Sequence, residues 1–318
     1  MTDYDLLREE RLARVSEQHR KMIEGWPSLA EIGVDGVRKL IEGGNRMFPV
    51  DPQVATRDVE VDGPDGPVPV RIYTPPHEEG ERLPVVVHTH SGGFVAGGGL
   101  DQWDGHNSLL ARSVPAVVVH PDFRLPPENR FPAGIEDNWA VLNWVAEGGD
   151  RQEWDAGRIA IGGGCTGGNM AAVLSLMARD AGGPSLSLQF LESWPSDLRC
   201  DTRSQEENAE GYGLTKADNA FVASQYVRSP EERWDWQASP LLAETVRDVA
   251  PALITVGDWD ILRDEDVQYA NRLRDAGVPV ELHVDPDRGH AGEPGPLIER
   301  VAASLRQAFA ADAATDGG

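Results

Sequence analysis

The 318-residue sequence has few cysteines and few lysines: Cys165 and Cys200 are its two cysteines, and Lys21, Lys39 and Lys216 its three lysines. Two cysteines do not make the disulfide framework of small secreted proteins, so free thiols are expected. No apolar run approaches the roughly 18 residues of a membrane span, and the first residues lack the apolar region of a secretory signal. These absences predict a cytoplasmic protein that does not bind membranes.

Positive charge is also scarce. Lys and Arg together number 29 against 53 Asp and Glu, which gives a formal net charge of -24. Nucleic acids and anionic membrane surfaces both require a positive footprint on the protein, so neither is an expected partner. The expected partner is a small-molecule substrate, and a homodimer is a further assembly that we consider.

The chain alternates short apolar runs with helical patterns. A hairpin is expected at 59–73, and helices at 6–26, 28–42, 133–147, 167–180, 264–276 and 294–310. Strands are expected at 83–90, 116–122, 158–163, 186–192, 252–258 and 280–285. This order predicts a mainly parallel sheet with helices on both faces. We expect a core of 51–194 and 241–318, with a helical cap made of 1–50 and the insert 195–240.

The most informative motif is GGCTG at 163–167, which joins an expected strand to an expected helix. A G-x-C-x-G sequence in this context is typical of a nucleophile elbow, whose sharp turn requires small flanking residues. Cys165 then lies at a helix N-terminus, where free N–H groups and the helix dipole favour a thiolate. Cys165 is therefore the predicted nucleophile.

A second glycine-rich loop, HSGGF at 90–94, follows the strand at 83–90. Such loops supply backbone N–H groups to an oxyanion hole, together with the residue after the nucleophile. The predicted donors are Gly92, Gly93 and Thr166, each contributing about 2.7–4 kcal/mol to the transition state.

The acid and the base are expected after the nucleophile in the chain. Asp258 and Asp260 both follow the strand at 252–258, and these residues alone leave the choice open. Of the eight histidines, His290 alone stands between the last strand and the last helix. His88 and His120 read as strand residues, and His106 as a surface residue. The order nucleophile, acid, histidine indicates an α/β-hydrolase fold.

These motifs resemble the hormone-sensitive-lipase-like branch of the α/β-hydrolases from about Arg71 to Gly292. HSGGF corresponds to the family's HGGGF, GGCTGGNMAA to GDSAGGNLAA, and WDILRDE and GHAG to its acid and histidine segments. The segments DFRLPPENRFPAGIEDNWAVLNW and SPLLAE are similar as well. The resemblance implies that Asp260 is the acid and that a helical cap covers the site.

Three residues depart from the family pattern. Cys165 replaces its serine, Gly164 its acidic residue and Ser91 the first glycine of its oxyanion loop. Because Asp260 and His290 remain, we interpret the changes as modified chemistry and not as loss of activity. Cys-His-Asp triads do occur on this fold: the G-x-C-x-G elbow of this chain resembles that of the dienelactone hydrolases, although the rest of the chain does not.

Three functions fit these residues. The first is acyl transfer, in which Cys165 attacks an ester, lactone or thioester with the help of His290 and Asp260. The second is cofactor-independent, non-hydrolytic chemistry of specialised metabolism, such as carbon–carbon bond formation, conjugate addition, cyclisation or elimination, with the oxyanion hole stabilising an enolate. The third is a non-catalytic receptor, which the retained triad disfavours.

Aromatic residues near the motifs predict a bulky, aromatic substrate, and we expect it to contact Phe94, Trp194, Trp259 and Trp236. Glu192 stands at a strand end and could add an acid or base, although a surface or salt-bridged role is the simpler expectation. No metal-ligand spacing, no G-x-G-x-x-G after a first strand and no G-K-[ST] occur. The sequence therefore predicts neither a metal nor another cofactor.

Overall fold

A computed structural model describes residues 3–44, 49–149, 154–290 and 294–316. The strands are β1 Ala55–Gly63, β2 Gly66–Thr74, β3 Leu83–His88, β4 Val117–Pro121, β5 Trp154–Gly164, β6 Leu188–Glu192, β7 Ala252–Gly257 and β8 Val280–Asp285. The α-helices are α1 Asp3–Leu12, α2 Glu17–Glu24, α3 Leu29–Gly44, α4 Asp104–Ser113, α5 Ala133–Ala146, α6 Thr166–Ala181, α7 Arg203–Glu207, α8 Lys216–Tyr226, α9 Arg263–Asp275 and α10 Pro294–Asp316.

The strands form one sheet in the order β1-β2-β4-β3-β5-β6-β7-β8. β1 and β2 form an antiparallel hairpin, and β2 pairs antiparallel with β4. From β4 to β8 every pairing is parallel. Strands β3, β4 and β7 are buried along their whole length, which explains why they are continuous apolar runs. The α/β-hydrolase fold expected from the motif order is present.

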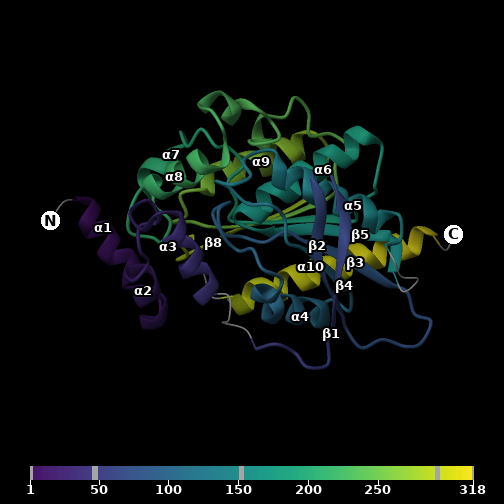
Figure 1. Cartoon of the computed structure of the whole chain (residues 1–318). Coiled ribbons are helices and arrows are strands. Elements are labelled where there is room, and N and C mark those ends of the chain that lie inside the picture. Colours follow the sequence, from purple (N-terminus) through teal and green to yellow (C-terminus); the bar gives the residue numbers. More distant parts are fainter. Residues whose placement is uncertain (1–2, 45–48, 150–153, 291–293, 317–318) are drawn as a thin grey trace.

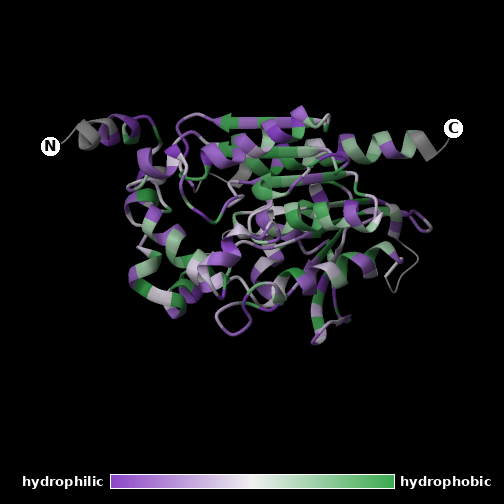
Figure 2. Ribbon diagram, turned by 90° about the horizontal axis from the view of Figure 1, so that it is seen from above, coloured by the Kyte–Doolittle hydropathy of each residue, from purple (hydrophilic) through white to green (hydrophobic). Residues whose placement is uncertain are grey.

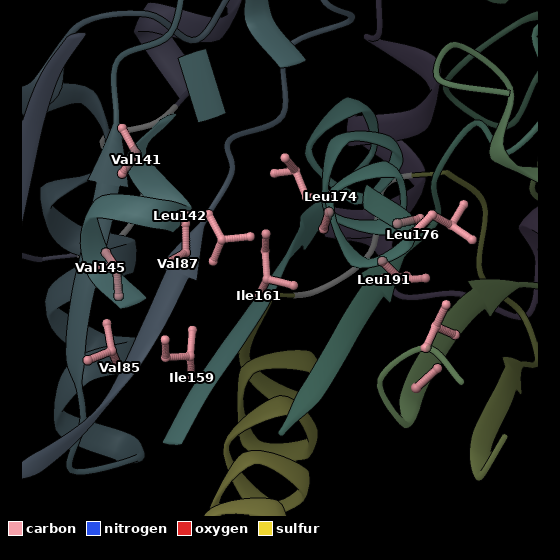
Figure 3. Close-up of a cluster of buried hydrophobic side chains, with 14 of the residues drawn as sticks. Val85, Val87, Val141, Leu142, Val145, Ile159, Ile161, Leu174, Leu176 and Leu191 are labelled. Carbon is pink, nitrogen blue, oxygen red and sulfur yellow. The ribbon is translucent and has the colours of Figure 1, made fainter. Parts of the chain in front are cut away.

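Helices cover both faces of the sheet (Figure 1). One face packs against α5, α6 and α9, and the other against α4 and α10. Figure 3 shows the first of these layers, where the side chains of β3 and β5 meet those of α5 and α6; the labelled residues are Val85, Val87, Val141, Leu142, Val145, Ile159, Ile161, Leu174, Leu176 and Leu191. A hydrophobic layer thus lies between the sheet and the helices on each face, and the site is built largely from the loops.

The N-terminal helices and the end of α10 lie at opposite ends of the molecule (Figures 1 and 2). Helix α3 packs against α8, although residues 45–215 separate them in the chain. Asp218 of α8 accepts hydrogen bonds from the Ser28 hydroxyl and the Ala30 backbone N–H, both at 3.0 Å. The expected cap segments 1–50 and 195–240 therefore contact each other, while residues 45–48 of the first lie outside the described residues.

Three local expectations differ from the structure. The helix predicted at 6–26 is two helices, α1 and α2, and Ser16, a residue favoured at helix starts, directly precedes the second. The insert 195–240 is only partly helical, because Gly211 and Gly213 adopt positive φ between α7 and α8. Helix α4 was not expected, since DGHNSLLARS carries a weak apolar pattern. Among the described residues, no helix is both long and apolar enough to cross a bilayer.

Candidate active site

Cys165 occupies a sharp turn between β5 and α6. Its backbone has φ 49° and ψ −125°, a conformation that L-residues rarely adopt, and its N–H donates to the Glu192 carbonyl at 2.8 Å. A Cβ added to Gly163 or Gly167 would lie 2.0 or 2.1 Å from the Thr89 carbonyl oxygen. The two glycines are therefore required by the close approach of the elbow to the end of β3.

His290 and Asp260 lie beside Cys165. The Nδ1 atom of His290 is 3.0 Å and 3.3 Å from the two carboxylate oxygens of Asp260, and His290 lies close enough to Cys165 for the two side chains to interact electrostatically. Asp260 is fully buried, and one of its oxygens accepts the Leu262 backbone N–H at 3.0 Å. Asp258, the other candidate acid, faces the Arg288 backbone N–H at 3.4 Å instead. The geometry thus selects Asp260 as the partner of the histidine.

These groups perturb each other's ionisation. Burial disfavours the charged imidazole, but the Asp260 carboxylate and Cys165 outweigh it and raise the pKa of His290 to about 10. Burial likewise opposes the charge on Asp260, yet His290 holds the pKa of that carboxyl below its ordinary value. His290 and Asp260 therefore form a buried imidazolium–carboxylate pair at neutral pH, beside the sulfur atom of Cys165.

The predicted oxyanion loop faces the same place. Gly92, Gly93 and Thr166 line one cavity with Cys165 and His290. Gly92 has φ +140°, and a Cβ there would lie 2.1 Å from the Ala96 carbonyl oxygen, so its loop cannot accept a side chain. Thr166 is the first residue of α6, and its N–H has no acceptor within the helix. The backbone around Cys165 can thus donate to a developing oxyanion.

Two cavities reach Cys165, Ser91 and His290. The first, of about 110 Å³, is mostly apolar and lies under the cap; its walls include Trp26, Leu29, Val37, Ile41, Leu214, Val222 and Leu262. The second, of about 240 Å³, lies on the other side of the elbow and has a mixed lining; its walls include His88, Trp103, His106, Gly164, Glu192, Ser193, Arg288, Leu297 and Ile298. Because it is the more polar of the two, we call it the polar cavity. The candidate nucleophile therefore stands between an apolar and a polar compartment.

The polar cavity contains residues to which we had assigned other roles. His106 was expected at the surface, but its ring stacks on His88 at 4.7 Å between centroids, and burial lowers its pKa. Glu192 was expected at the surface or in a salt bridge, and it forms no ion pair within the described part of the chain. Burial raises the pKa of Glu192 to about 7, although Arg288 and Arg300 oppose the rise. The sequence signals for this cavity are Gly164, which removes a side chain from its wall, and Glu192, which stands at the end of an expected strand.

The four aromatic residues predicted to contact substrate pack into the protein instead. Phe94 stacks on Tyr226 with 3.9 Å between ring centroids, and Trp194 meets Tyr269 edge-on at 4.9 Å. The remaining contacts are of the same kind: Trp259 lies against Tyr212, and Trp236 packs against the core. None of the four lines either cavity at Cys165 in the described residues. The structure therefore gives them a packing role, and the aromatic residues that border the cavities are Trp26 and Trp103.

Across the residues with described positions, no group of three or more His, Cys, Asp or Glu side chains is arranged to hold a metal ion. Residues 291–292 of the GHAG motif lie outside the described residues. The described groups that surround Cys165 are an imidazole, a carboxyl group and backbone N–H donors.

Known proteins resemble this chain over most of its length. The profile of the family described as alpha/beta hydrolase fold matches residues 86–292. Esterase LipI of Mycobacterium tuberculosis is 41% identical over 256 residues, covering 79% of this chain and 78% of that protein. Carboxylesterase NlhH of the same organism is 40% identical over 229 residues, or 70% of each. The solved structure of the Pyrobaculum calidifontis esterase has a TM-score of 0.83 at 33% identity, covering 92% of this chain and 98% of that one.

Proposed function

The chain belongs to the α/β-hydrolase family, within its hormone-sensitive-lipase-like branch, and from that premise we propose that it hydrolyses carboxylic esters through a thioester on Cys165. The observation that carries the proposal is the placement of Cys165 beside His290, whose Nδ1 atom contacts Asp260 at 3.0 Å, at the mouth of two cavities. Named esterases among the relatives favour hydrolysis over other acyl chemistry. The protein is an enzyme, and the proposal concerns its nucleophile and substrate.

In the acylation step the Cys165 thiolate attacks the ester carbonyl carbon, and the carbonyl oxygen becomes an oxyanion. The N–H groups of Gly92, Gly93 and Thr166 stabilise this oxyanion. When the carbon–oxygen bond to the alcohol breaks, the His290 imidazolium gives its proton to the leaving oxygen. Asp260 keeps the imidazole oriented throughout, as its 3.0 Å contact with Nδ1 requires.

In the deacylation step Cys165 is a neutral thioester, so His290 has lost one of the two anionic partners that favour its charged form. The neutral imidazole can then accept a proton from the attacking water. The tetrahedral intermediate collapses by breaking the carbon–sulfur bond, which releases the carboxylic acid and restores the thiolate–imidazolium pair. A thioester also reacts readily with other nucleophiles, so transfer to an alcohol or amine is compatible with the same site.

The cavities support a small acyl group. The apolar cavity, at about 110 Å³, is well below the roughly 300–1,000 Å³ of sites for drug-sized ligands. The expectation of a bulky, aromatic substrate depended on Phe94, Trp194, Trp259 and Trp236, all of which pack in the protein interior. We therefore propose a short aliphatic acyl chain in the apolar cavity.

A second candidate function is the non-hydrolytic enolate chemistry. The observation that favours it is Glu192, a carboxyl group with a pKa of about 7 in the cavity that contains Cys165. Such a group can move a second proton at neutral pH, which simple hydrolysis does not require.

The test is intact mass spectrometry together with turnover of p-nitrophenyl butyrate. Wild type is expected to gain one butyryl mass, Cys165→Ser to react with altered rates, and Cys165→Ala to gain none and to lose turnover. Cys200→Ala is the matched control, because burial raises the pKa of Cys200 to about 12 and keeps it an unreactive thiol. Full turnover by Cys165→Ala would exclude covalent catalysis, and tight ligand binding without turnover would indicate a receptor.

A further inference from the structure

The polar cavity beside Cys165 has no part in the mechanism above. It measures about 240 Å³, and the catalytic pair Cys165 and His290 forms one of its walls. His290 also borders the apolar cavity, so the alcohol that leaves the tetrahedral intermediate on Cys165 is protonated at the boundary between the two compartments. A leaving alcohol can extend from that boundary into the polar cavity.

Glu192 presents a carboxyl group to this cavity because Gly164 has no side chain. The two residues are register partners on β5 and β6, and a Cβ placed on Gly164 would lie 3.5 Å from the Oε2 atom of Glu192. Any longer side chain at 164 would therefore grow against this carboxyl group or into the cavity. Gly164 is also one of the three departures from the family pattern, which links the opening of the cavity to the altered elbow.

The other walls supply polar groups that the protein does not fully use. The Nδ1 atom of His88 and the Nε atom of Arg288 are both buried and both lack a hydrogen-bond partner among the described residues. Burial and neighbouring histidines hold the pKa of His88 well below 6.5, so it is a neutral imidazole with one donor and one acceptor. Because both atoms are closed off from the cavity, the carboxyl group of Glu192 is the wall group on which the recognition of a polar ligand depends.

The charges of Glu192 and of the groups around it, Arg288, Arg300 and Asp285, balance when Glu192 is ionised. Arg288 and Arg300 both bind Asp285, at 2.8 Å and 3.0 Å, so two guanidinium groups share one carboxylate. Both arginines interact electrostatically with Glu192, which supplies the second negative charge. A neutral set of this kind gives no strong preference for an anion or a cation, and it suits an uncharged hydrogen-bonding group.

We propose that this cavity binds the alcohol part of the ester and selects an alcohol with further hydroxyl groups, one of which donates a hydrogen bond to Glu192. This inference rests on the proposed ester hydrolysis. It assigns the two compartments different halves of one substrate: a short apolar acyl chain under the cap, and a polyol such as a glyceryl group beside Gly164. The reaction class that supplies such a substrate is esterification of a polyol.

Two esters with the same acyl chain test the selection. Wild type is expected to hydrolyse 2,3-dihydroxypropyl butyrate with a kcat/KM at least about 10-fold above that of propyl butyrate, the range for a hydrogen bond to a charged group. Glu192→Leu should lower this ratio by about 10-fold or more, and Glu192→Gln, which keeps one acceptor oxygen, by less. Gly164→Asp should lower it too, because it fills the cavity. Equal values for the two esters in wild type, or a ratio that Glu192→Leu leaves unchanged, would overturn the inference.

A binding measurement keeps the test independent of the reaction. The ethers 3-butoxypropane-1,2-diol and butyl propyl ether differ by the same two hydroxyl groups and cannot be hydrolysed. Calorimetry should show tighter binding of the diol to wild type, and this preference should be lost in Glu192→Leu. If neither ester acylates Cys165 but the diol preference is present, the proposed hydrolysis fails and the subsite stands. If both esters are cleaved and no diol preference is found in either assay, the subsite fails alone.

Discussion

Replacing Asp260 with asparagine isolates the electrostatic part of the candidate triad. The change preserves the size of a fully buried side chain and removes its negative charge, 3.0 Å from His290 Nδ1. Because the pKa of His290 is raised to about 10 by Asp260 and Cys165 against the effect of burial, losing Asp260 should lower it. The expected loss is about 1–3 units, the usual effect of one close opposite charge, so the variant should titrate at about 7–9.

The free energy that favours the charged form of His290 follows from the same pKa values. The rise from the ordinary 6.5 to about 10 in the pKa of His290 represents on the order of 5 kcal/mol in favour of the imidazolium. Asp260→Asn should remove about 1.4–4 kcal/mol of this preference. At pH 8 about one tenth to nine tenths of the variant molecules would then hold a neutral imidazole, against about one hundredth of the wild-type molecules, and the rate of thiol-dependent acylation should fall accordingly.

The measurement is a ¹³C NMR titration of the His290 ring. Asp258→Asn is the matched control, because Asp258 faces the Arg288 backbone and not the histidine. We expect the control to leave the pKa of His290 within about half a unit of wild type, and Cys165→Ala to lower it, since it removes the other anionic partner. An unchanged pKa in both Asp260→Asn and Cys165→Ala would refute the electrostatic account of the site.

Three further predictions concern stability. The pKa of His290 in the folded state lies above its unfolded value. The contribution of His290 to the free energy of unfolding should therefore be complete below about pH 6.5 and be lost as the pH rises toward 10. Urea titrations of wild type and His290→Gln at pH 6 and pH 10 should show the larger difference at pH 6. Gly163→Ala places a Cβ 2.0 Å from a carbonyl oxygen and should lower the free energy of unfolding by about 1–3 kcal/mol or more. In Gly164→Ala the nearest atom to the new Cβ is 3.5 Å away, so the free energy of unfolding should change by less than about 1 kcal/mol. Asn169→Ala should cost about 1–3 kcal/mol, because the Asn169 amide donates to the Pro195 and Ala238 carbonyls at 2.8 and 2.9 Å; equal urea midpoints for this variant and wild type would contradict that role.

Much of the fold is readable from local patterns. The valine-rich runs of β3 and β4 are uninterrupted because both faces of these strands are covered, and continuous apolar runs between helical patterns indicate a parallel sheet. The short helix α4 escaped prediction because its polar sequence has little apolar periodicity, and it owes its place to packing against α10 and the sheet.

The candidate triad is a mixed case. The elbow at Cys165 and the position of His290 follow from glycine spacing and chain order, which are local properties of the sequence. The choice between Asp258 and Asp260 does not follow from spacing, because both aspartates come shortly after the same strand, β7. The direction of each side chain decides it, and the 3.0 Å contact with His290 belongs to Asp260.

By itself the sequence determined the sheet, the elbow, the oxyanion loop and the histidine, because each depends on residues that are neighbours along the chain. Only the tertiary structure decided that the expected substrate aromatics are packed inside, and that a polar cavity opens beside the nucleophile. That cavity joins His88, His106, Gly164, Glu192 and Arg288, which come from three strand ends, helix α4 and the loop after β8. No periodicity or spacing links residues so distant, since their contact is created by the parallel sheet, which brings the carboxyl ends of its strands to one edge.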